Sequence, residues 1–396
     1  MRRYAAISLL CLTAACGGSA TPAAPTGPLI VVSAPLTAAP WIGGFTERGA
    51  RLAVEHLNVG RARPYRLEVL DNAASPQVAA ANARKAVADG AVALITDGTG
   101  ALAVSQVTDP AALPVFVVFD GGGSFIDAKA HPTLFRLAPA NRYLTRRLAD
   151  YLSAKATSVA VLGDDSSYGR DGVEPLVAAL ARNTIPVVSR AVLPVGAANV
   201  SAQVLAARRA NAQALVVWAD ASDVAAVVRA ARSTGWQVPI FTGTTGEDPL
   251  VRQRLADHPE WLDGTTFVSF RMTTEQGPGP FNAFRAAYEK RFGADQIGVS
   301  AGGRPVIQPP DWATYSYDAV VLVDAALAHV GQAGGTVLAA LQVVSTTSAN
   351  GDERGYSPTD REGVSPSDMY FGRFQQLRFA PVTDDLLSTH LPTIGQ

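Results

Sequence analysis

Short runs of β-branched and other apolar residues alternate along the chain with longer stretches whose apolar residues recur roughly every three or four positions. The runs predict strands and the stretches predict helices, because buried parallel strands are apolar throughout whereas covering helices keep one apolar face. In the first part of the chain, the pattern predicts strands at 29–34, 65–70, 92–96 and 115–119 and helices at 44–58, 76–89 and 101–111. Strict alternation of strand and helix indicates right-handed crossovers and a parallel sheet covered on both faces.

A second round with the same rhythm follows. It predicts helices at 142–154, 172–182, 200–210 and 222–234 and strands at 158–162, 187–193, 214–218 and 240–242. After residue 264 the rhythm changes. Helices at 281–292 and 312–330 are expected, without an intervening strand, to pack back on the first lobe, and 370–379 is expected to return as a strand to the second.

We therefore predict an α/β fold of two Rossmann-like lobes, each a parallel sheet flanked by helices, joined by hinge crossovers. The expected boundaries place 29–139 plus 266–368 in lobe 1 and 140–265 plus 369–396 in lobe 2.

The beginning of the chain has the pattern of an export signal. Arg2 and Arg3 precede a short apolar run, and the small residues Ala14 and Ala15 lead into Cys16. The pattern predicts a signal peptide over 1–15, too short to span a bilayer permanently. The cysteine resembles that of a bacterial lipobox, which predicts lipidation of Cys16, a linker over 16–28 and a place in the periplasm or at the cell surface, anchored to the membrane. Plain cleavage beside an incidental cysteine is the alternative.

Composition narrows the classes of function. The chain has 396 residues, 48% of them apolar, and a formal net charge of −1, which gives no electrostatic basis for binding nucleic acid. Its five histidines show no metal-ligand spacing, and Gly98-Thr99-Gly100 lacks the third glycine of a dinucleotide fingerprint, so we expect neither metal nor cofactor. Gly298-Val299-Ser300-Ala301-Gly302 fits the nucleophile-elbow pattern but lacks its flanking strand and helix, and a glycine-rich loop is the preferred interpretation.

Ligands of parallel α/β sheets bind beyond the carboxyl ends of the strands, so the loops that leave those ends are the expected site. These loops are 35–43, 71–75, 97–100 and 120–124 in the first lobe and 163–171, 219–223 and 243–248 in the second. They are rich in glycine, hydroxyl groups and carboxylates, and each lobe adds an aromatic residue, Trp41 or Tyr168. Two such rims predict a cleft between the lobes, although any one of these residues could be an ordinary turn residue.

Several segments occur in an order and spacing typical of one family. They are Ala34-Pro35-Leu36, the helix start at 49–55, Phe135-Arg136-Leu137-Ala138-Pro139, the stretch 161–169 ending in Tyr168-Gly169, and Tyr317-Asp318-Ala319-Val320. From about residue 29 to 379 the chain resembles the type I periplasmic-binding-protein superfamily, in particular the branched-chain amino-acid binding proteins of ABC importers. The resemblance implies a non-enzymatic receptor that closes two lobes around a small polar ligand and delivers it to an ABC permease.

The resemblance also implies site residues. In the family, a hydroxyl and backbone groups of the first lobe hold the ligand's carboxylate and ammonium, and by position these are Thr99, Gly122 and Gly123. Tyr168 matches the aromatic residue of the second lobe, and Trp41 matches a lid. The full expected set of ligand-binding residues is Trp41, Asp97, Thr99, Gly122, Gly123, Tyr168, Asp220 and Thr245.

Thr245 stands where the family normally has an acid that pairs with the ligand's ammonium. Because a neutral residue cannot balance a buried cation, another carboxylate must do so, or the ligand is not an α-amino acid. The candidates are Asp97, Asp120, Asp220 and Glu247.

Two other functions stay open at this point. One is a binding protein that senses its ligand for a signalling partner without transport. The other is a secreted hydrolase that uses Ser300 as its nucleophile.

Overall fold

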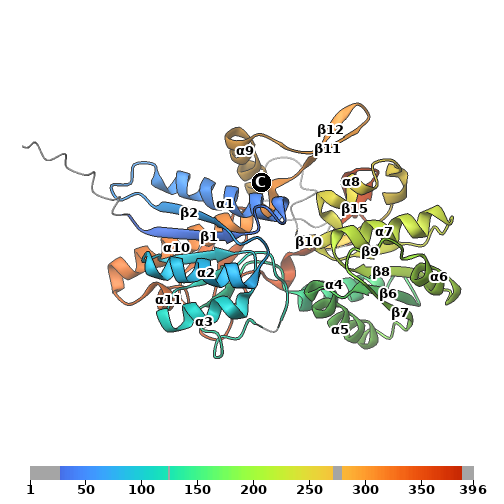
Figure 1. The fold of residues 1–396 in the computed structure, drawn as a ribbon, viewed down its shortest axis with the longest axis horizontal. Coiled ribbons are helices and arrows are strands. Elements are labelled where there is room, and N and C mark those ends of the chain that lie inside the picture. The colour runs from blue at the N-terminus through green and yellow to red at the C-terminus, as the bar shows by residue number, and fades with distance from the viewer. Residues whose placement is uncertain (1–26, 124, 271–278, 386–396) are drawn as a thin grey trace, which may run out of the picture.

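The computed structural model describes residues 27–123, 125–270 and 279–385. The predicted signal peptide, Cys16 and most of the linker therefore lie outside the described residues. The described chain forms two large sheets side by side, each flanked by helices, and two small two-stranded sheets (Figure 1). This arrangement is the predicted α/β fold.

The first sheet is parallel throughout, in the order β2-β1-β3-β4-β5. Its strands are β1 (Leu29–Ala34), β2 (Arg66–Asp71), β3 (Ala93–Thr96), β4 (Val115–Val117) and β5 (Leu134–Arg136). The helices of this half are α1 (Pro40–Asn58), α2 (Pro76–Ala88), α3 (Ala101–Ala111), α9 (Pro280–Phe292), α10 (Ala313–Ala333) and α11 (Val337–Ala340). Both α9 and α10 pack against α1, so the predicted return of the late helices to the first lobe is confirmed.

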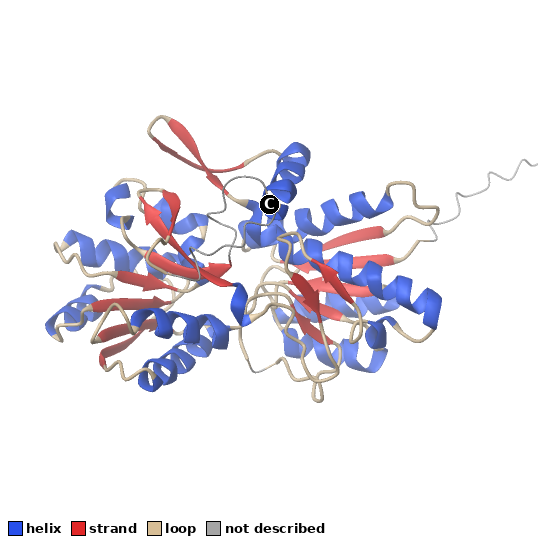
Figure 2. Ribbon diagram, turned by 180° about the vertical axis from the view of Figure 1, so that it is seen from behind, coloured by secondary structure: helices blue, strands red, loops and turns tan. Residues whose placement is uncertain are grey.

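The second sheet has seven strands in the order β16-β15-β10-β9-β8-β6-β7. Its strands are β6 (Val159–Asp164), β7 (Val187–Leu193), β8 (Ala214–Trp218), β9 (Ile240–Thr242), β10 (Thr266–Phe270), β15 (Met369–Gln375) and β16 (Arg378–Pro381). The helices beside it are α4 (Asn141–Leu152), α5 (Ser167–Arg182), α6 (Ser201–Arg209), α7 (Ala221–Ser233) and α8 (Pro249–Arg254). The strands from β10 to β7 are parallel, and β15 and β16 run antiparallel to their neighbours (Figure 2).

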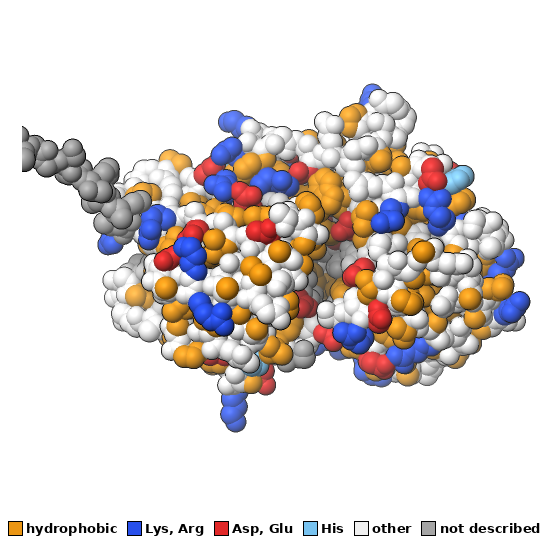
Figure 3. All heavy atoms as spheres, viewed as in Figure 1, with side chains coloured by type: hydrophobic (Ala, Val, Ile, Leu, Met, Phe, Trp, Pro, Cys, Tyr) orange, Lys and Arg blue, Asp and Glu red, His pale blue; other side chains and the backbone are white. Residues whose placement is uncertain are grey.

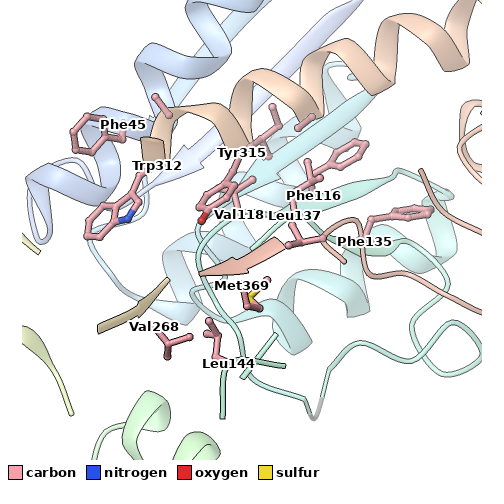
Figure 4. Close-up of a cluster of buried hydrophobic side chains, with 14 of the residues drawn as sticks. Phe45, Phe116, Val118, Phe135, Leu137, Leu144, Val268, Trp312, Tyr315 and Met369 are labelled. Atoms are coloured by element: carbon pink, nitrogen blue, oxygen red, sulfur yellow. The ribbon is translucent and has the colours of Figure 1, made fainter. Parts of the chain in front are cut away.

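One buried apolar cluster connects the two halves. Phe116 and Phe135 stack in the first sheet with ring centroids 5.9 Å apart. Val268 of β10 and Met369 of β15 belong to the same cluster, although both strands lie in the second sheet (Figure 4). The segments that cross between the halves therefore run through a packed core.

The structure corrects the prediction in the later part of the chain. Strand β10 pairs within the second sheet, whereas no parallel strand was expected between residue 264 and the late helices, and the boundary at 266 assigned this segment to the first lobe. The predicted strand 370–379 is a hairpin of β15 and β16, because Gln376 adopts a left-handed φ of 53° and reverses the chain.

Residues 298–302 are not a glycine-rich loop but part of a projecting hairpin of β11 (Asp295–Ala301) and β12 (Arg304–Gln308). Gly298 lies at a register shift with φ of 79°, and Gly302 and Gly303, also at positive φ, make the turn. A second hairpin, of β13 (Ser345–Thr347) and β14 (Glu353–Gly355), occupies part of the segment expected to be turns.

The contact between α1 and α10 depends on the missing side chain of Gly49. A Cβ at this position would lie 2.0 Å from the carbonyl oxygen of Ala313 and 2.3 Å from Oγ of Ser316. We expect Gly49→Ala to lower the free energy of unfolding by about 1–3 kcal/mol in urea denaturation, because the helices must move apart.

Gly331→Ala is the matched control. It lies in α10 with no atom within 4 Å of an added Cβ. The free energy of unfolding should stay the same or rise by about 0.5–1 kcal/mol, since alanine favours the helix. Equal losses in the two variants would contradict this account of the α1–α10 contact.

Candidate functional site

A cavity of about 520 Å³ lies between the carboxyl ends of the two sheets, where the sequence predicted a cleft. Figure 3 shows a hollow between the two halves of the molecule, with acidic side chains along its margins. Residues of both halves line the cavity, and we name two loop regions among them: the first rim (97–100 and 120) and the second rim (166–168, 220, 244–245 and 248).

The first rim begins where β3 turns into α3. Gly98, with φ of 119°, lies so close to Asp120 that a Cβ on it would be 2.3 Å from the Asp120 Cβ. The carboxylate of Asp97 accepts hydrogen bonds from the Thr99 hydroxyl at 2.5 Å, the Thr99 N–H at 3.3 Å and Nδ2 of Asn72 at 2.7 Å. Burial nevertheless raises the pKa of Asp97, because these donors only partly replace water.

Asp120 is the second carboxylate of the first rim. Its Oδ1 accepts the N–H of Gly122 at 2.7 Å. Burial raises its pKa, and the nearby charges of Asp171 and Asp97 add to that effect, while the Gly122 N–H and Arg136 oppose it. The guanidinium of Arg136 lies behind the loop, donating to the carbonyl oxygens of Asp120 and Gly122, and it does not line the cavity.

In the second rim, Tyr168 stacks on Trp218 with ring centroids 5.6 Å apart and an interplanar angle of 18°. Its hydroxyl lies 3.5 Å from Oγ1 of Thr244, and burial raises its pKa to about 12, so the phenol is neutral. Gly243 leaves room for this hydroxyl, since a Cβ there would lie 2.0 Å from it. Thr245 is oriented by donating to the carbonyl oxygen of Ala219 at 2.7 Å.

Asp220 precedes the first turn of α7. Its N–H donates to Asp164 at 2.5 Å, but its own carboxylate has no hydrogen bond or ion pair among the described residues. Burial, followed by the charges of Asp164, Asp223 and Asp248, raises the pKa of Asp220 to about 6. An incompletely compensated carboxylate thus lies at the cavity surface.

Aromatic side chains from distant parts of the chain form an apolar wall. Phe119 packs edge-on against Trp312 at 5.4 Å and against Tyr315 at 6.0 Å between ring centroids. Figure 4 shows Trp312 and Tyr315 side by side near the start of α10. The Trp312 indole N–H donates at 2.8 Å to Glu247, whose side chain is fully buried behind the wall.

The cavity brings together part of the predicted set. Asp97, Thr99, Tyr168, Asp220 and Thr245 line it. The other three do not line it: Trp41 stacks on Phe45 at 6.0 Å, Gly122 lies behind Asp120, and Gly123 is exposed. The roles of all eight in ligand binding stay predictions.

The prediction of individual site residues missed Phe119, Asp248, Trp312 and Tyr315, which line the same cavity. Phe119 and Asp248 border or belong to the predicted loops, and their position was a usable signal. Trp312 and Tyr315 begin a helix far along the chain, and no local pattern places them at this site.

Two other chemistries have no support in the structure. In the part of the chain that is described, no group of three or more His, Cys, Asp and Glu residues could hold a metal ion, and no helix has both the length and the apolar character needed to cross a membrane.

Ser300 lies inside the β11–β12 hairpin, paired opposite Pro305, and not at a turn between a strand and a helix. The hydrolase hypothesis is therefore wrong.

The raised pKa of Asp220 predicts a pH dependence of stability. Because its pKa is higher in the folded than in the unfolded chain, folding takes up protons between about pH 4 and 6, and the free energy of unfolding falls as pH rises through this range. Asp220→Asn removes the ionisable carboxylate and with it the free-energy cost of keeping its charge partly buried beside other carboxylates. After solvent screening, we expect the variant to be about 1 kcal/mol more stable at pH 7.5 and equal to the parent at pH 4.

Urea denaturation at both pH values measures this difference. Glu353→Gln controls for removing one negative charge, because Glu353 is exposed and has no ion pair among the described residues. A gain from Asp220→Asn that is the same at pH 4 and pH 7.5 would show that the carboxylate's charge is not its cause.

Comparisons with known proteins agree with this geometry. The sequence profile of the periplasmic binding protein family matches residues 34–377, whereas a sequence search of curated proteins finds no match. Among solved structures, a periplasmic binding protein type 1 from Bordetella pertussis Tohama I is similar with a TM-score of 0.77 at 20% identity, over 91% of this chain and 98% of that chain.

A substrate-binding protein of an ABC transporter from Sphaerobacter thermophilus has a TM-score of 0.76 at 18% identity, over 91% of this chain and 97% of that chain. The branched-chain amino acid transporter substrate binding protein LivJ from Streptococcus pneumoniae, in complex with isoleucine, has a TM-score of 0.75 at 18% identity, over 89% and 97%. At these identities the structures establish the fold alone. The profile match establishes more: the chain belongs to the periplasmic binding protein family, solute-binding proteins of the ABC-transporter type that are not enzymes.

Proposed function

We propose that this protein is the extracytoplasmic receptor of an ABC importer, and that it closes two lobes around a small polar ligand and delivers it to a permease. The observation that carries the proposal is the cavity between the carboxyl ends of two sheets, with polar side chains supplied by both. A ligand that touches both rims gains contacts in the closed state that it lacks in the open state, and this difference drives closure.

The proposed ligand class is a small polar molecule such as an amino acid or a related amide or carboxylate. Two structural relatives support a ligand of amino-acid size, since one was solved in complex with isoleucine and the other in complex with leucine. The cavity of about 520 Å³ is of the order expected for a small-molecule site.

We further propose that Cys16 carries the lipid anchor, since family membership implies an extracytoplasmic location. Residues 16–28 would then tether the folded body to the membrane. The proposed lobes are 29–139 plus 266–368 and 140–265 plus 369–396, except that β10 pairs with the second sheet.

The proposed contacts predict losses of affinity. Tyr168→Ala removes an aromatic surface of the second rim, and Thr99→Ala removes the hydroxyl that orients Asp97 in the first. Each should weaken binding of a ligand found by a thermal-shift screen of amino acids, amides, amines and small carboxylates by about 1–3 kcal/mol. Isothermal titration calorimetry measures the change.

Tyr143→Ala and Thr234→Ala are the matched controls, because both residues lie outside the cavity lining. They should leave affinity within about twofold of the parent, which is below the cost of a lost hydrogen bond. If Tyr168→Ala and Thr99→Ala also left affinity unchanged, the cavity would not be the binding site.

Closure itself predicts a change in shape. Small-angle X-ray scattering should show a smaller radius of gyration when the screened ligand is added at a saturating concentration, because the outer parts of the two halves approach each other. Tyr168→Ala at the same ligand concentration, below saturation for this variant, should show a smaller decrease. An unchanged radius at full occupancy would argue against hinge closure.

A further inference from the structure

The charges at the cavity surface are all of one sign. Four carboxylates line it, Asp97 and Asp120 from the first rim and Asp220 and Asp248 from the second. No lysine, arginine or histidine is among the described residues that line it. Both halves of the molecule therefore present negative charge to the same enclosed space.

Two of these carboxylates have a cation behind them. Arg136 lowers the pKa of Asp120, and Arg252 lowers that of Asp248, in each case against a larger effect of burial. Both guanidinium groups also have other partners: Arg136 binds Glu362 through two hydrogen bonds of 2.8 Å, and Arg252 donates to Gln308.

The other two have no cationic partner among the described residues. Asp97 is bound by neutral donors only, those of Thr99, Asn72 and Thr96. The carboxylate of Asp220 accepts no hydrogen bond within the described residues, and its neighbours Asp164, Asp223 and Asp248 are themselves acidic. One uncompensated carboxylate thus faces the cavity from each rim.

The donors predicted for a ligand carboxylate at Thr99 and Gly122 are already used. The hydroxyl and the N–H of Thr99 both donate to Asp97, and the N–H of Gly122 donates to Asp120. A ligand carboxylate placed there would meet the like charge of Asp97 instead of free donors, and like charges in a partly dehydrated space repel strongly. Asp97 thus accepts the hydrogen bonds of Thr99 that the carboxylate of an amino-acid ligand was expected to accept.

Given the proposed receptor function, on which this step rests, we infer that the ligand is a small organic cation, bearing ammonium or guanidinium groups and no carboxylate. This narrows the class of small polar ligands proposed above and removes amino acids and carboxylates from it. Its charged groups lie against Asp97 and Asp220, and its carbon chain against the wall of Phe119, Trp312 and Tyr315. The faces of such rings also attract cations.

Pairs of compounds that differ only in a carboxylate test the inference. Arginine and agmatine form one pair, and leucine and 3-methylbutylamine form another. Calorimetry and thermal shift at pH 7.5 should show the amine of at least one pair binding about tenfold or more tightly than its amino acid, because the carboxylate meets Asp97. Acetate and neutral amides of the same size complete the panel.

Variants connect the binding to the named carboxylates. Asp97→Asn and Asp220→Asn should each weaken binding of the tighter amine about tenfold or more, since each removes a charge that pairs with it. Asp89→Asn, which removes an exposed charge at the end of α2, should change affinity less than about twofold.

The possible outcomes distinguish a failure of the cationic-ligand inference from a failure of the proposed receptor function. If amino acids, amides or acetate bind and the amines do not, the receptor function stands and the cationic ligand is wrong. If an amine binds but neither Asp97→Asn nor Asp220→Asn weakens it, the inference is also wrong. If no compound of any class binds or shifts the melting temperature, the proposed receptor function itself fails.

Discussion

The buried guanidinium of Arg136 is the contact on which the first half of the cleft depends. It ends β5 with no exposed surface, and it binds both carboxylate oxygens of Glu362 at 2.8 Å. Its remaining nitrogen donates to the carbonyl oxygens of Asp120 and Gly122. Because a buried cation is tolerated only when its donors are satisfied, one side chain positions the crossover, the rim loop and the late segment that passes back between the halves.

This arrangement also determines where positive charge is available. Arg136 is largely neutralised by Glu362. Arg252 donates through Nη2 to Gln308 and through Nη1 to the carbonyl oxygen of Ile307, and its Cζ lies 4.3 Å from the ring centroid of Phe379. The described arginines beside the rims therefore act as structural supports behind the cavity, and the surface that a ligand meets is acidic. The buried arginines thus stabilise the rim loops from behind, while the cavity surface itself carries only negative side chains and favours a positively charged ligand.

Regular alternation of strands and helices predicted the two sheets and the loops at their carboxyl ends, because burial on both faces leaves a strong pattern. The pairing of β10 and the β11–β12 hairpin were not predictable, since partners far along the chain decide them. At the site, Asp97 follows β3 directly and Tyr168 lies in the first turn of α5, four residues after β6, whereas Trp312 comes from the start of a remote helix. The bond from Thr99 to Asp97, two residues apart, could have been anticipated, since threonine and aspartate commonly bind neighbouring polar groups.

The acidic rims also bear on closure. Burial is the largest cause of the raised pKa of Asp97, Asp120, Asp220 and Asp248, so each carboxylate already carries a cost of lost hydration. Bringing the rims together removes more water from all four and brings like charges closer, which opposes closure of an empty cleft. A bound cation reverses the sign of that contribution, because its attraction to the rims grows as water leaves. Under the proposed receptor function, the carboxylates that oppose closure of the empty cleft are thus the groups through which a cationic ligand would close it.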